Sequence, residues 1–412
     1  MHDYISVSWQ YARMSQLPDP LRRLRADTAE RERRGLRRTP RVRTPDGAGV
    51  LDLASNDYLG LARDPRVVEA AAAAARCWGA GSTGSRLVTG STELHARLES
   101  RLAEAMYGGR ALVFSSGYLA NLAAITALAP AGTLIVSDQA NHASLIDACR
   151  LARGRTLVTP HLDTGAVEAA LAARTEPAAL VVTEGVFSVS GRQAPLAELH
   201  RIARRHGALL VVDEAHALGV VGPQGRGAAV AAGIAGPGAP APDLVRTATL
   251  SKSLGAQGGA VVAAPEVVET LVDTGRGFIF DTALAPAAAG AALAALGVVL
   301  AEPGLPLRAR AHARKVAEIA AGLDLRAGAP DAAVVSVVLG SPHTATAAAR
   351  LCLDRDVHVG CFRPPSVPDG GSCLRLTARA DLSAADLDRV AHALSAVAGA
   401  VRAAGASPGT AR

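Results

Sequence analysis

Short β-branched or apolar runs alternate with alanine-rich stretches of helical character from Ala111 onward. The runs predicted to form strands are Ala111–Ser115, Thr133–Ser137, Ala179–Glu184, Ala208–Asp213, Val245–Leu250 and Gly259–Ala263. Runs of this length separated by helices are typical of βαβ units, in which a mostly parallel sheet is covered by helices on both faces. The chain is therefore predicted to have an α/β fold.

The length of the chain, 412 residues, exceeds what a single hydrophobic core usually serves, so we expect more than one domain. Residues 1–54 are predicted to form an arginine-rich helical segment that ends in a short strand near Val50–Leu53. Residues 55–290 carry the alternating pattern and are expected to form the large domain. Residues 291–412 are expected to form a smaller α/β domain, with strands at Ala333–Leu339, Val357–Cys361 and Cys373–Thr377.

The formal net charge of +6 comes from scattered arginines, which are densest from Arg22 to Arg43. Surfaces that bind nucleic acid combine basic side chains with aromatic side chains that stack on bases, but aromatic residues make up only 3% of this chain. We therefore expect an anionic small substrate or a solvated helix to explain the charge, and no nucleic-acid partner.

The cysteines and the apolar stretches indicate the cellular location of the protein. Its five cysteines are an odd number without CxxC spacing, which favours reduced thiols and argues against a zinc or other metal site. The start, Met1–Tyr4, lacks the basic-then-apolar order of a signal peptide. The long uncharged stretch Ala283–Ala301 is mostly alanine and glycine, so we expect a buried helix and not a membrane span. A cytoplasmic protein without a membrane partner is the expectation.

Polar residues follow most of the predicted strands. In sheets of this kind ligands gather at the carboxyl ends of the strands, so these residues are expected to converge on one ligand. They are Ser115–Tyr118, Asp138 with Asn141 and His142, Glu184 with Ser188, Asp213–His216, and Thr249 with Lys252.

Only two of the 43 Lys and Arg residues are lysines, Lys252 and Lys315. Because a guanidinium stays protonated while an amine can lose its proton and attack a carbonyl, a lysine retained in such a chain is a candidate for Schiff-base chemistry. Lys252 lies between an apolar run and a glycine-rich stretch, where such an amine would be displayed. The alternative is a solvated lysine, which is the interpretation we keep for Lys315.

Pyridoxal phosphate needs an amine for its aldehyde, a carboxylate at its ring nitrogen, a flat group against its ring and donors for its phosphate. Asp213 is the candidate carboxylate, although an Asp at a strand end can also cap the next helix. His216 would reach the phenolic oxygen and His142 would stack on the ring, although each could be an ordinary loop histidine. The phosphate would bind at Ser115–Tyr118, where a helix start offers free N–H groups, with the Thr249 hydroxyl beside it; a plain helix entry is the alternative.

Six ordered motifs resemble those of the α-oxoamine synthases, fold-type I pyridoxal-phosphate enzymes that condense an amino acid with an acyl thioester and release carbon dioxide. The resemblance runs from about residue 20 to the end of the chain. The motifs are Ser55–Gly60, Gly81–Arg86 with His95, Thr183–Ser188, Asp213–His216, Thr249–Lys252 and Arg363–Pro368.

Within that family the run Ser85–Gly90 is most similar to the members of the biotin pathway, whose substrates are L-alanine and a pimeloyl thioester on coenzyme A or acyl carrier protein. The resemblance therefore implies decarboxylative acyl transfer to L-alanine and, since the family builds its site at a subunit interface, a homodimer. Two alternatives stay open: a relative that uses another acyl thioester or amino acid, and a catalytically silent homologue that acts as a binding protein.

The resemblance also implies roles for individual residues. Lys252 would bind the cofactor aldehyde and move the α-proton, Asp213 would pair with the ring nitrogen, and His142 would stack on the ring. The remaining implied contacts are His216 and Ser188 at the phenolic oxygen; Gly117, Tyr118 and Thr249 at the phosphate; Thr282 at the phosphate of the neighbouring subunit; Arg363 at the carboxylate of the amino acid, with Asn56 and Ser366 beside the substrate; and Arg37 at the acyl substrate.

The sequence departs from the family pattern at three places. Ser366 stands where the family often has Thr, which keeps the hydroxyl. Asp281 precedes Thr282 where a second Ser or Thr is frequent, and Ala378–Asp381 replaces a more usual Leu-Thr-Ala-His ending. The effect of both carboxylates on the site is left open by the sequence.

Overall fold

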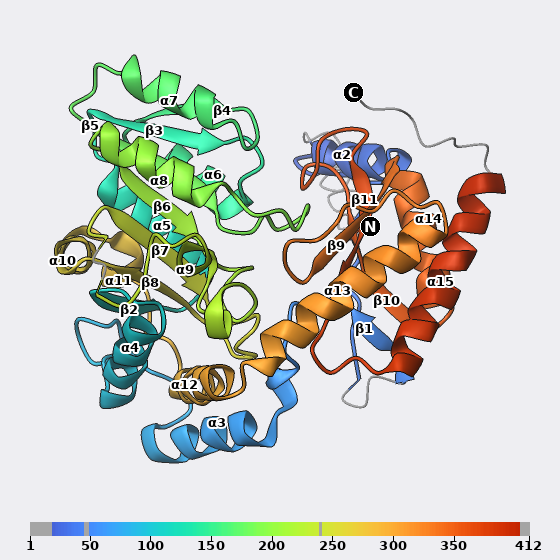
Figure 1. Ribbon diagram of the computed structural model, residues 1–412, viewed down its shortest axis with the longest axis horizontal. Helices are drawn as coiled ribbons and strands as arrows, with labels where there is room; N and C mark the ends of the chain where they lie inside the picture. The colour runs from blue at the N-terminus through green and yellow to red at the C-terminus, as the bar shows by residue number, and fades with distance from the viewer. Residues whose placement is uncertain (1–18, 45–48, 239–240, 404–412) are drawn as a thin grey trace, which may run out of the picture.

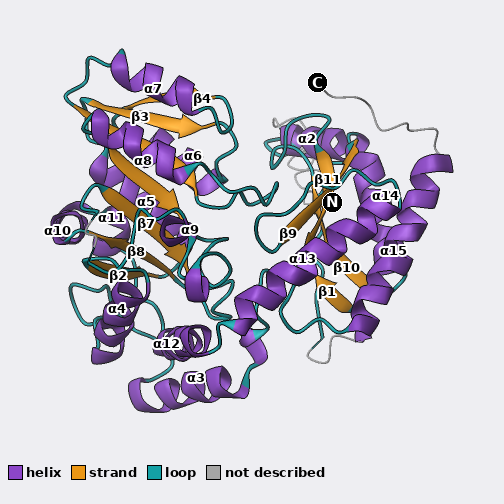
Figure 2. Ribbon diagram, in the orientation of Figure 1, coloured by secondary structure: helices purple, strands orange, loops and turns teal. Residues whose placement is uncertain are grey.

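The computed structural model describes residues 19–44, 49–238 and 241–403. Two lobes lie side by side in Figures 1 and 2, and each is built on one β-sheet with helices packed against it. The larger sheet has seven strands and the smaller has four. The predicted α/β fold is confirmed.

The large sheet runs in the order β2-β8-β7-β6-β5-β3-β4. Its strands are β2 (Arg110–Phe114), β3 (Thr133–Asp138), β4 (Arg155–Thr159), β5 (Ala178–Glu184), β6 (Leu209–Asp213), β7 (Leu244–Thr249) and β8 (Gly259–Ala263). Strand β8 is antiparallel to both of its neighbours, and every other pair is parallel. All six predicted strands are present. Only β4 was missed, because it is an edge strand with a single buried residue and so lacks an apolar run.

Both faces of this sheet are buried, because its strand residues point alternately into two apolar cores. Ile135 and Val211 pack into one core, and Leu134 and Val212 pack into the other. The helices over the first core are α5 (Gly117–Leu128), α6 (Ala143–Leu151), α10 (Pro265–Thr274) and α11 (Arg276–Ile279). Those over the second are α3 (Pro65–Trp78), α4 (Glu93–Ala105), α7 (Thr164–Ala172), α8 (Leu196–Arg205), α9 (Ala228–Ala231) and α12 (Pro286–Ala301), with the short helices η2 (Leu61–Arg63) and η3 (Pro223–Gly225) in the adjoining loops.

The smaller sheet runs in the order β1-β10-β11-β9. Its elements are β1 (Leu51–Leu53), β9 (Val334–Gly340), β10 (Val357–Phe362), β11 (Ser372–Thr377) and the helices α2 (Arg22–Arg33), α13 (Gly304–Gly322), α14 (Pro342–Leu353) and α15 (Ala384–Ala403). All four predicted strands of this region are present. Strand β1 pairs in parallel with β10, so the chain passes through the smaller sheet before it builds the larger one.

The expected boundary between residues 290 and 291 lies inside α12, which packs against α3 and α4 of the large lobe. We propose that the lobes divide after α12, where the chain turns by 82° into α13.

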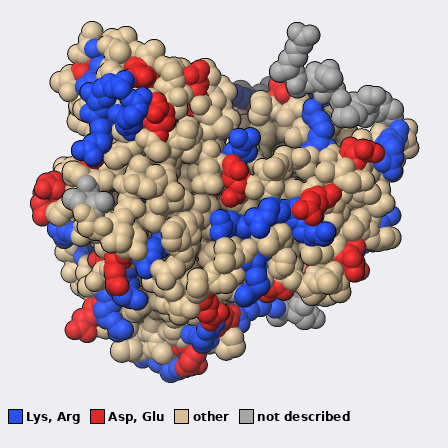
Figure 3. All heavy atoms as spheres, in the orientation of Figure 1, with Lys and Arg blue, Asp and Glu red and all other residues tan. Residues whose placement is uncertain are grey.

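Helix α12 is buried along most of its length, as expected for the stretch Ala283–Ala301. Within the described residues no single helix is long and apolar enough to cross a membrane; only α12 and α13 taken together, as a bent pair, reach the required length and composition. Lys315 lies on the exposed side of α13 and pairs with Glu318 at 3.4 Å, as expected of a solvated lysine. On the face drawn in Figure 3, acidic and basic side chains are interspersed.

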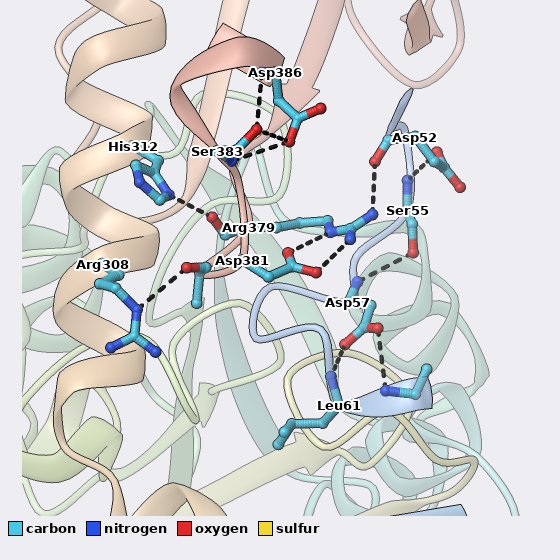
Figure 4. Close-up of polar contacts among 12 residues, drawn as sticks. Asp52, Ser55, Asp57, Leu61, Arg308, His312, Arg379, Asp381, Ser383 and Asp386 are labelled. Atoms are coloured by element: carbon cyan, nitrogen blue, oxygen red, sulfur yellow. Dashed lines mark hydrogen bonds and ion pairs between the residues drawn. The ribbon is translucent and has the colours of Figure 1, made fainter. Parts of the chain in front are cut away.

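The segment from Asp52 to Leu61 connects the two lobes and is held by polar contacts on both sides (Figure 4). The Asp57 carboxylate accepts hydrogen bonds from the backbone N–H of Leu61 at 2.9 Å and of Ala62 at 3.1 Å. The backbone N–H of Ala380 donates to the Tyr58 carbonyl at 2.8 Å. Beside that contact Arg379 and Asp381 form a two-bond ion pair of 2.9 and 2.6 Å, so the carboxylate at position 381 has a cation of its own. Tyr58 is therefore fixed between the lobes.

Candidate active site

A cavity of about 260 Å³ opens at the carboxyl ends of β5, β6 and β7. Seven of the predicted site residues line it: Gly117, Tyr118, His142, Asp213, His216, Thr249 and Lys252. Ser116, Asn121, Ser144, Glu184, Ala215 and Ser251 complete the lining. Because the strands are parallel, their carboxyl ends meet at one edge of the sheet, which brings residues far apart in the sequence together.

Lys252 follows strand β7 and is partly buried, with its Nζ 2.8 Å from His216 Nε2. The pKa of this amine is lowered from 10.5 to about 8: burial is the largest cause and the charge of Arg375 adds to it, while Asp213 and Glu184 oppose the shift. An amine with this pKa is partly neutral at physiological pH and can act as a nucleophile.

Asp213 ends strand β6 and is 5% exposed. Its Oδ1 accepts from the Ala215 N–H at 2.8 Å, and its Oδ2 accepts from Asn121 Nδ2 at 2.8 Å. The bond from Ala215 is the kind expected if Asp213 only capped the chain that follows it. The bond from Asn121 is different, because it connects the carboxylate to helix α5. Asp213 is therefore fixed in orientation by two donors from different elements.

Asn121 joins three polar groups and was not predicted as a site residue. Besides Asp213 it donates to Ser144 Oγ at 2.8 Å, and its Oδ1 accepts from Thr247 Oγ1 at 2.5 Å. Ser144 in turn hydrogen-bonds His142 Nδ1 at 2.8 Å. Because the amide nitrogen of Asn121 donates to Ser144 Oγ, we assign the Ser144 hydroxyl proton to His142 Nδ1, which places the ring proton of neutral His142 on Nε2. One buried amide thus orients both the carboxylate and the ring that face the cavity.

His216 is 4% exposed and touches two polar side chains. Its Nε2 faces Lys252, and its Nδ1 makes a short hydrogen bond with the hydroxyl of Tyr58, which is fully buried. Burial, followed by the charges of Lys252 and Arg375, lowers the pKa of His216 well below its ordinary value, so the ring is neutral at physiological pH.

Glu184 ends strand β5 beside Asp213 and is 1% exposed. Burial and the charge of Asp213 raise the pKa of Glu184 well above its ordinary value. Its Oε2 accepts from the backbone N–H of Ser188 at 2.9 Å, while its Oε1 has no hydrogen-bond partner within the described part of the chain. The sequence placed Glu184 at this sheet edge but gave it no role.

The end of the cavity near α5 is suited to an anion. Ser116 caps this helix by accepting from the Leu119 N–H at 3.1 Å, and the first-turn N–H groups of α5 are free of helical partners, as at any helix start. A Cβ at Gly117 would lie 2.9 Å from Cβ of Thr249, so only glycine allows this close approach. The Thr249 hydroxyl lies at the same place, 2.6 Å from Ser251 Oγ and 3.1 Å from the Gly258 carbonyl, to which it donates in this structure.

Taken together, the residues fit pyridoxal phosphate in each of its parts. A single cavity is lined by a nucleophilic amine, an oriented carboxylate, a cavity-facing imidazole and an anion-binding helix start. Tyr118, also in the lining, is 44% exposed and donates its hydroxyl to Asp147.

Six of the predicted residues lie outside the cavity lining formed by the described residues: Ser188, Thr282, Arg37, Asn56, Arg363 and Ser366. Ser188 is adjacent to it and contributes its backbone N–H to Glu184. Thr282 is exposed and bridges to Ser85 through the backbone.

The predicted substrate arginines are engaged elsewhere. Arg363 Nη1 donates to the Gly35 carbonyl at 2.6 Å and to Thr346 Oγ1 at 3.1 Å. Arg37 pairs with Glu32 at 3.1 Å, and its side chain is 56% exposed. Ser366 is exposed and donates its N–H to the Arg363 carbonyl. In this structure, therefore, the carboxylate of a bound amino acid would meet neither arginine.

Arg375 is the cation that does face the site, and sequence reasoning missed it. It lies in β11 and is 6% exposed, with its guanidinium 5.0 Å from the centre of the Phe362 ring. It donates to Asn56 Oδ1, and its charge lowers the pKa of both Lys252 and His216. The available signal was a single charged residue inside the apolar run Cys373–Thr377.

Comparison with known proteins agrees with this geometry. Residues 48–394 match the family model of aminotransferase class I and II. The 8-amino-7-oxononanoate synthase of Mycolicibacterium vanbaalenii is 57% identical over 373 residues, which cover 90% of this chain and 96% of that protein. The synthase of Mycolicibacterium smegmatis is 58% identical over 361 residues, covering 87% and 92%.

Solved structures share the fold. Serine palmitoyltransferase of Sphingomonas wittichii superposes with a TM-score of 0.86 at 29% identity and covers 95% of this chain and all of that chain. A serine palmitoyltransferase structure that contains pyridoxal phosphate gives 0.85 at 30% identity, with coverage of 95% and 100%. The 8-amino-7-oxononanoate synthase of Francisella tularensis gives 0.73 at 26% identity, covering 86% and 98%.

The predicted fold type, cofactor and family are thereby confirmed: this is a fold-type I enzyme that uses pyridoxal phosphate for acyl transfer with decarboxylation. The chain belongs to the aminotransferase class I and II family and, within it, to the 8-amino-7-oxononanoate synthases of the α-oxoamine synthase group.

Proposed function

We propose that this protein condenses L-alanine with a pimeloyl thioester to give 8-amino-7-oxononanoate, carbon dioxide and the free thiol of the carrier. The observation that carries the proposal is the Lys252 amine, with its pKa of about 8, in one cavity with the oriented Asp213 carboxylate, in a chain 57% identical to a synthase of that name. When bound, pyridoxal phosphate supplies an aldehyde for amines and a ring that accepts the electrons left at the α-carbon.

Four groups would hold the cofactor. Asp213 pairs with the ring nitrogen, because its two hydrogen bonds fix the carboxylate at the cavity wall. His142 stacks on the ring in the orientation set by Ser144. The start of α5 would hold the phosphate, with the backbone N–H groups of Gly117 and Tyr118 and the hydroxyl of Thr249. His216 and Ser188 are the proposed contacts of the phenolic oxygen.

Lys252 moves the proton of the reaction. Its Nζ takes the proton from the α-carbon of L-alanine and later returns one to the α-carbon of the product, after carbon dioxide has left. A pKa of about 8 suits both steps, because the amine then gains and loses a proton at little cost near physiological pH. With the cofactor bound, Asp213 would keep the ring nitrogen protonated, so that the ring could accept electrons.

Arg375 and Asn56 are our proposed contacts for the carboxylate of L-alanine. Arg375 is buried beside the cavity and offers donors in a planar fork, and Asn56 is held against it. Arg363, Ser366 and Arg37 would contact the substrates only after the segments that carry them move toward the cavity, since Arg363 and Arg37 are bonded elsewhere in this structure.

We also propose a cytoplasmic homodimer in which Thr282 reaches the phosphate of the partner's site. Thr282 is exposed and lies next to Phe280, which is 70% exposed, as expected of a surface that a second subunit covers. Sedimentation of the loaded enzyme tests this: a species of twice the 41.8 kDa chain mass is expected, and a fully active monomer would contradict it.

The proposed reaction is tested with purified enzyme, L-alanine and pimeloyl-coenzyme A or pimeloyl-acyl carrier protein. We expect the amino ketone and carbon dioxide in equal amounts with at least one carrier, and neither with Lys252→Ala. Turnover of a shorter thioester, or of another amino acid, with no product from the pimeloyl substrates would assign the protein to another α-oxoamine synthase reaction.

A further inference from the structure

A continuous chain of hydrogen bonds leads from the catalytic amine into the protein interior. Lys252 Nζ lies 2.8 Å from His216 Nε2, and His216 Nδ1 makes a short bond with the Tyr58 hydroxyl. That hydroxyl lies 3.4 Å from Asn56 Oδ1, which also accepts from Arg375 Nη2. Asn56 and Tyr58 belong to the segment that connects the two lobes. His216 follows β6, Lys252 follows β7, and Arg375 lies in β11.

The directions of these bonds follow from the donors available. Arginine is a donor only, so Asn56 must offer its carbonyl oxygen to Arg375. The Tyr58 hydroxyl has one proton and two acceptors within reach, Asn56 Oδ1 and His216 Nδ1. Two arrangements of protons therefore fit the same heavy atoms.

In the first arrangement Tyr58 donates to Asn56 and accepts from a proton on His216 Nδ1, so His216 Nε2 presents a lone pair to Lys252. This arrangement suits an ammonium group, which can only donate. In the second, Tyr58 donates to His216 Nδ1 and the ring proton is on Nε2, which suits a neutral Lys252 amine with a lone pair. His216 is neutral in both.

We propose that Tyr58 is a positioning residue for the catalytic amine: its hydroxyl turns between Asn56 and His216, so that His216 offers a lone pair to Lys252 when it is an ammonium and an N–H when it is an amine. The proposal rests on the proposed role of Lys252, which must alternate between these two states when it takes and returns the α-proton. Because Tyr58 occupies Nδ1, His216 has only Nε2 for the cavity, so at these stages it serves the amine and leaves the phenolic oxygen to Ser188. His216 stays neutral at both stages, because only the position of its ring proton changes.

The surroundings support a neutral relay. Tyr58 is fully buried, and burial raises the pKa of its hydroxyl to about 12, so it keeps its proton. Cationic Arg375 faces the relay and, with burial, disfavours a charged His216. The other titratable groups that face Lys252 and His216 are Asp213, Glu184 and His142. Tyr58 itself is kept in place through its backbone carbonyl, which accepts from Ala380, and through the turn built on Asp57 (Figure 4).

The two lysines of the chain make the test direct. In cofactor-free protein, trace acetylation with acetic anhydride at a series of pH values, read by peptide mass spectrometry, reports the pKa of the Lys252 amine, with exposed Lys315 as the internal reference. In Tyr58→Phe, His216 Nδ1 loses the one side-chain partner that it has among the described residues, and because a buried N–H without an acceptor is the costlier state, the ring proton moves to Nε2. The Lys252 ammonium then loses its acceptor, and we expect the pKa of Lys252 to fall by about one unit, a tenfold change in its protonation equilibrium.

The matched control is Tyr107→Phe, whose ring packs against Arg226, outside the cavity lining, and which should leave the pKa of Lys252 unchanged. Circular dichroism and the melting temperature show whether each variant is folded. A folded Tyr58→Phe protein in which the pKa of Lys252 equals that of the wild type would overturn the proposal.

A second measurement needs no variant of Tyr58. In protein labelled with ¹⁵N-histidine, with the His216 signals assigned by their loss in His216→Gln, we expect the Nδ1–H tautomer below the pKa of Lys252 and the Nε2–H tautomer above it. A doubly protonated His216 near pH 7, or a tautomer that does not change with pH, would contradict the relay. Because both measurements use cofactor-free protein, a failure of the wild type to make product would count against the proposed function alone.

Discussion

The carboxylate of the amino acid should bind to Arg375 and not to Arg363, and two matched substitutions separate these arginines. Arg375 is 6% exposed and lies close enough to Lys252 and His216 for its charge to lower the pKa of both, so its loss would leave a substrate carboxylate in a mostly buried site without this cation. Truncating one partner of a buried, hydrogen-bonded charge pair costs about 2–5 kcal/mol, and a central value of about 3 kcal/mol weakens binding about 150-fold. We therefore expect Arg375→Met to raise the Kd for L-alanine by about two orders of magnitude.

The same substitution has a second effect that substrate binding alone does not explain. Arg375 lowers the pKa of Lys252, so its removal should move that pKa upward from about 8, toward the ordinary value of 10.5. Arg375→Lys keeps the charge but not the planar fork, and should show the intermediate loss in affinity with little change in the pKa of Lys252.

The assay is a titration of the loaded enzyme with L-alanine, followed by the absorbance of the bound cofactor. Arg363→Met is the control, because the hydrogen bonds of Arg363 within the described part of the chain go to Gly35 and Thr346 and not to a cavity residue. The Kd of this variant for L-alanine should stay within about threefold of the wild-type value, which is the size of effect expected from a surface contact. A hundredfold loss in Arg363→Met together with wild-type affinity in Arg375→Met would refute the assignment.

Three further predictions follow from the site. Asn121→Ala removes the partner of three buried polar groups and should lower the free energy of unfolding by about 3 kcal/mol, measured with urea; a loss below about 1 kcal/mol would contradict the network. Since burial lowers the pKa of Lys252 to about 8 and only the neutral amine attacks an aldehyde, the rate of cofactor uptake by cofactor-free protein should rise about tenfold per pH unit below pH 8 and level off above it; a rise that continues to about pH 10 would place the amine in solvent. Gly259→Ala puts a Cβ 2.3 Å from the Ser116 carbonyl and should weaken cofactor binding by displacing the start of α5, whereas Gly297→Ala, with open space around it, should leave binding unchanged.

The architecture could be predicted because it follows from patterns that are local in the sequence. Parallel strands buried on both faces are continuous apolar runs, so six strands of the large sheet were visible, and their carboxyl ends predicted where Asp213 and Lys252 would converge. Strand β4 was not visible, because an edge strand with exposed side chains has no such run.

The residues that sequence reasoning missed share a physical reason. Asn121 lies one turn inside helix α5, Arg375 lies inside an apolar strand, and Tyr58 lies in the segment that connects the two lobes. Each reaches the site only through the packing of elements far apart in the chain, which no local pattern records. Arg363 shows the converse case, in which a sequence motif predicts a contact that this structure does not contain. The motif predicted Arg363 at the substrate, but its guanidinium donates to the Gly35 carbonyl.

The central claim is that the amine of Lys252 is the group joined to the cofactor aldehyde. Reducing the loaded enzyme with borohydride and mapping its peptides tests this most directly, because the chain has only two lysines. The account predicts one equivalent of reduced cofactor on the peptide that contains Lys252 and none on the peptide that contains Lys315. Modification of Lys315, or recovery of both peptides unmodified, would contradict it.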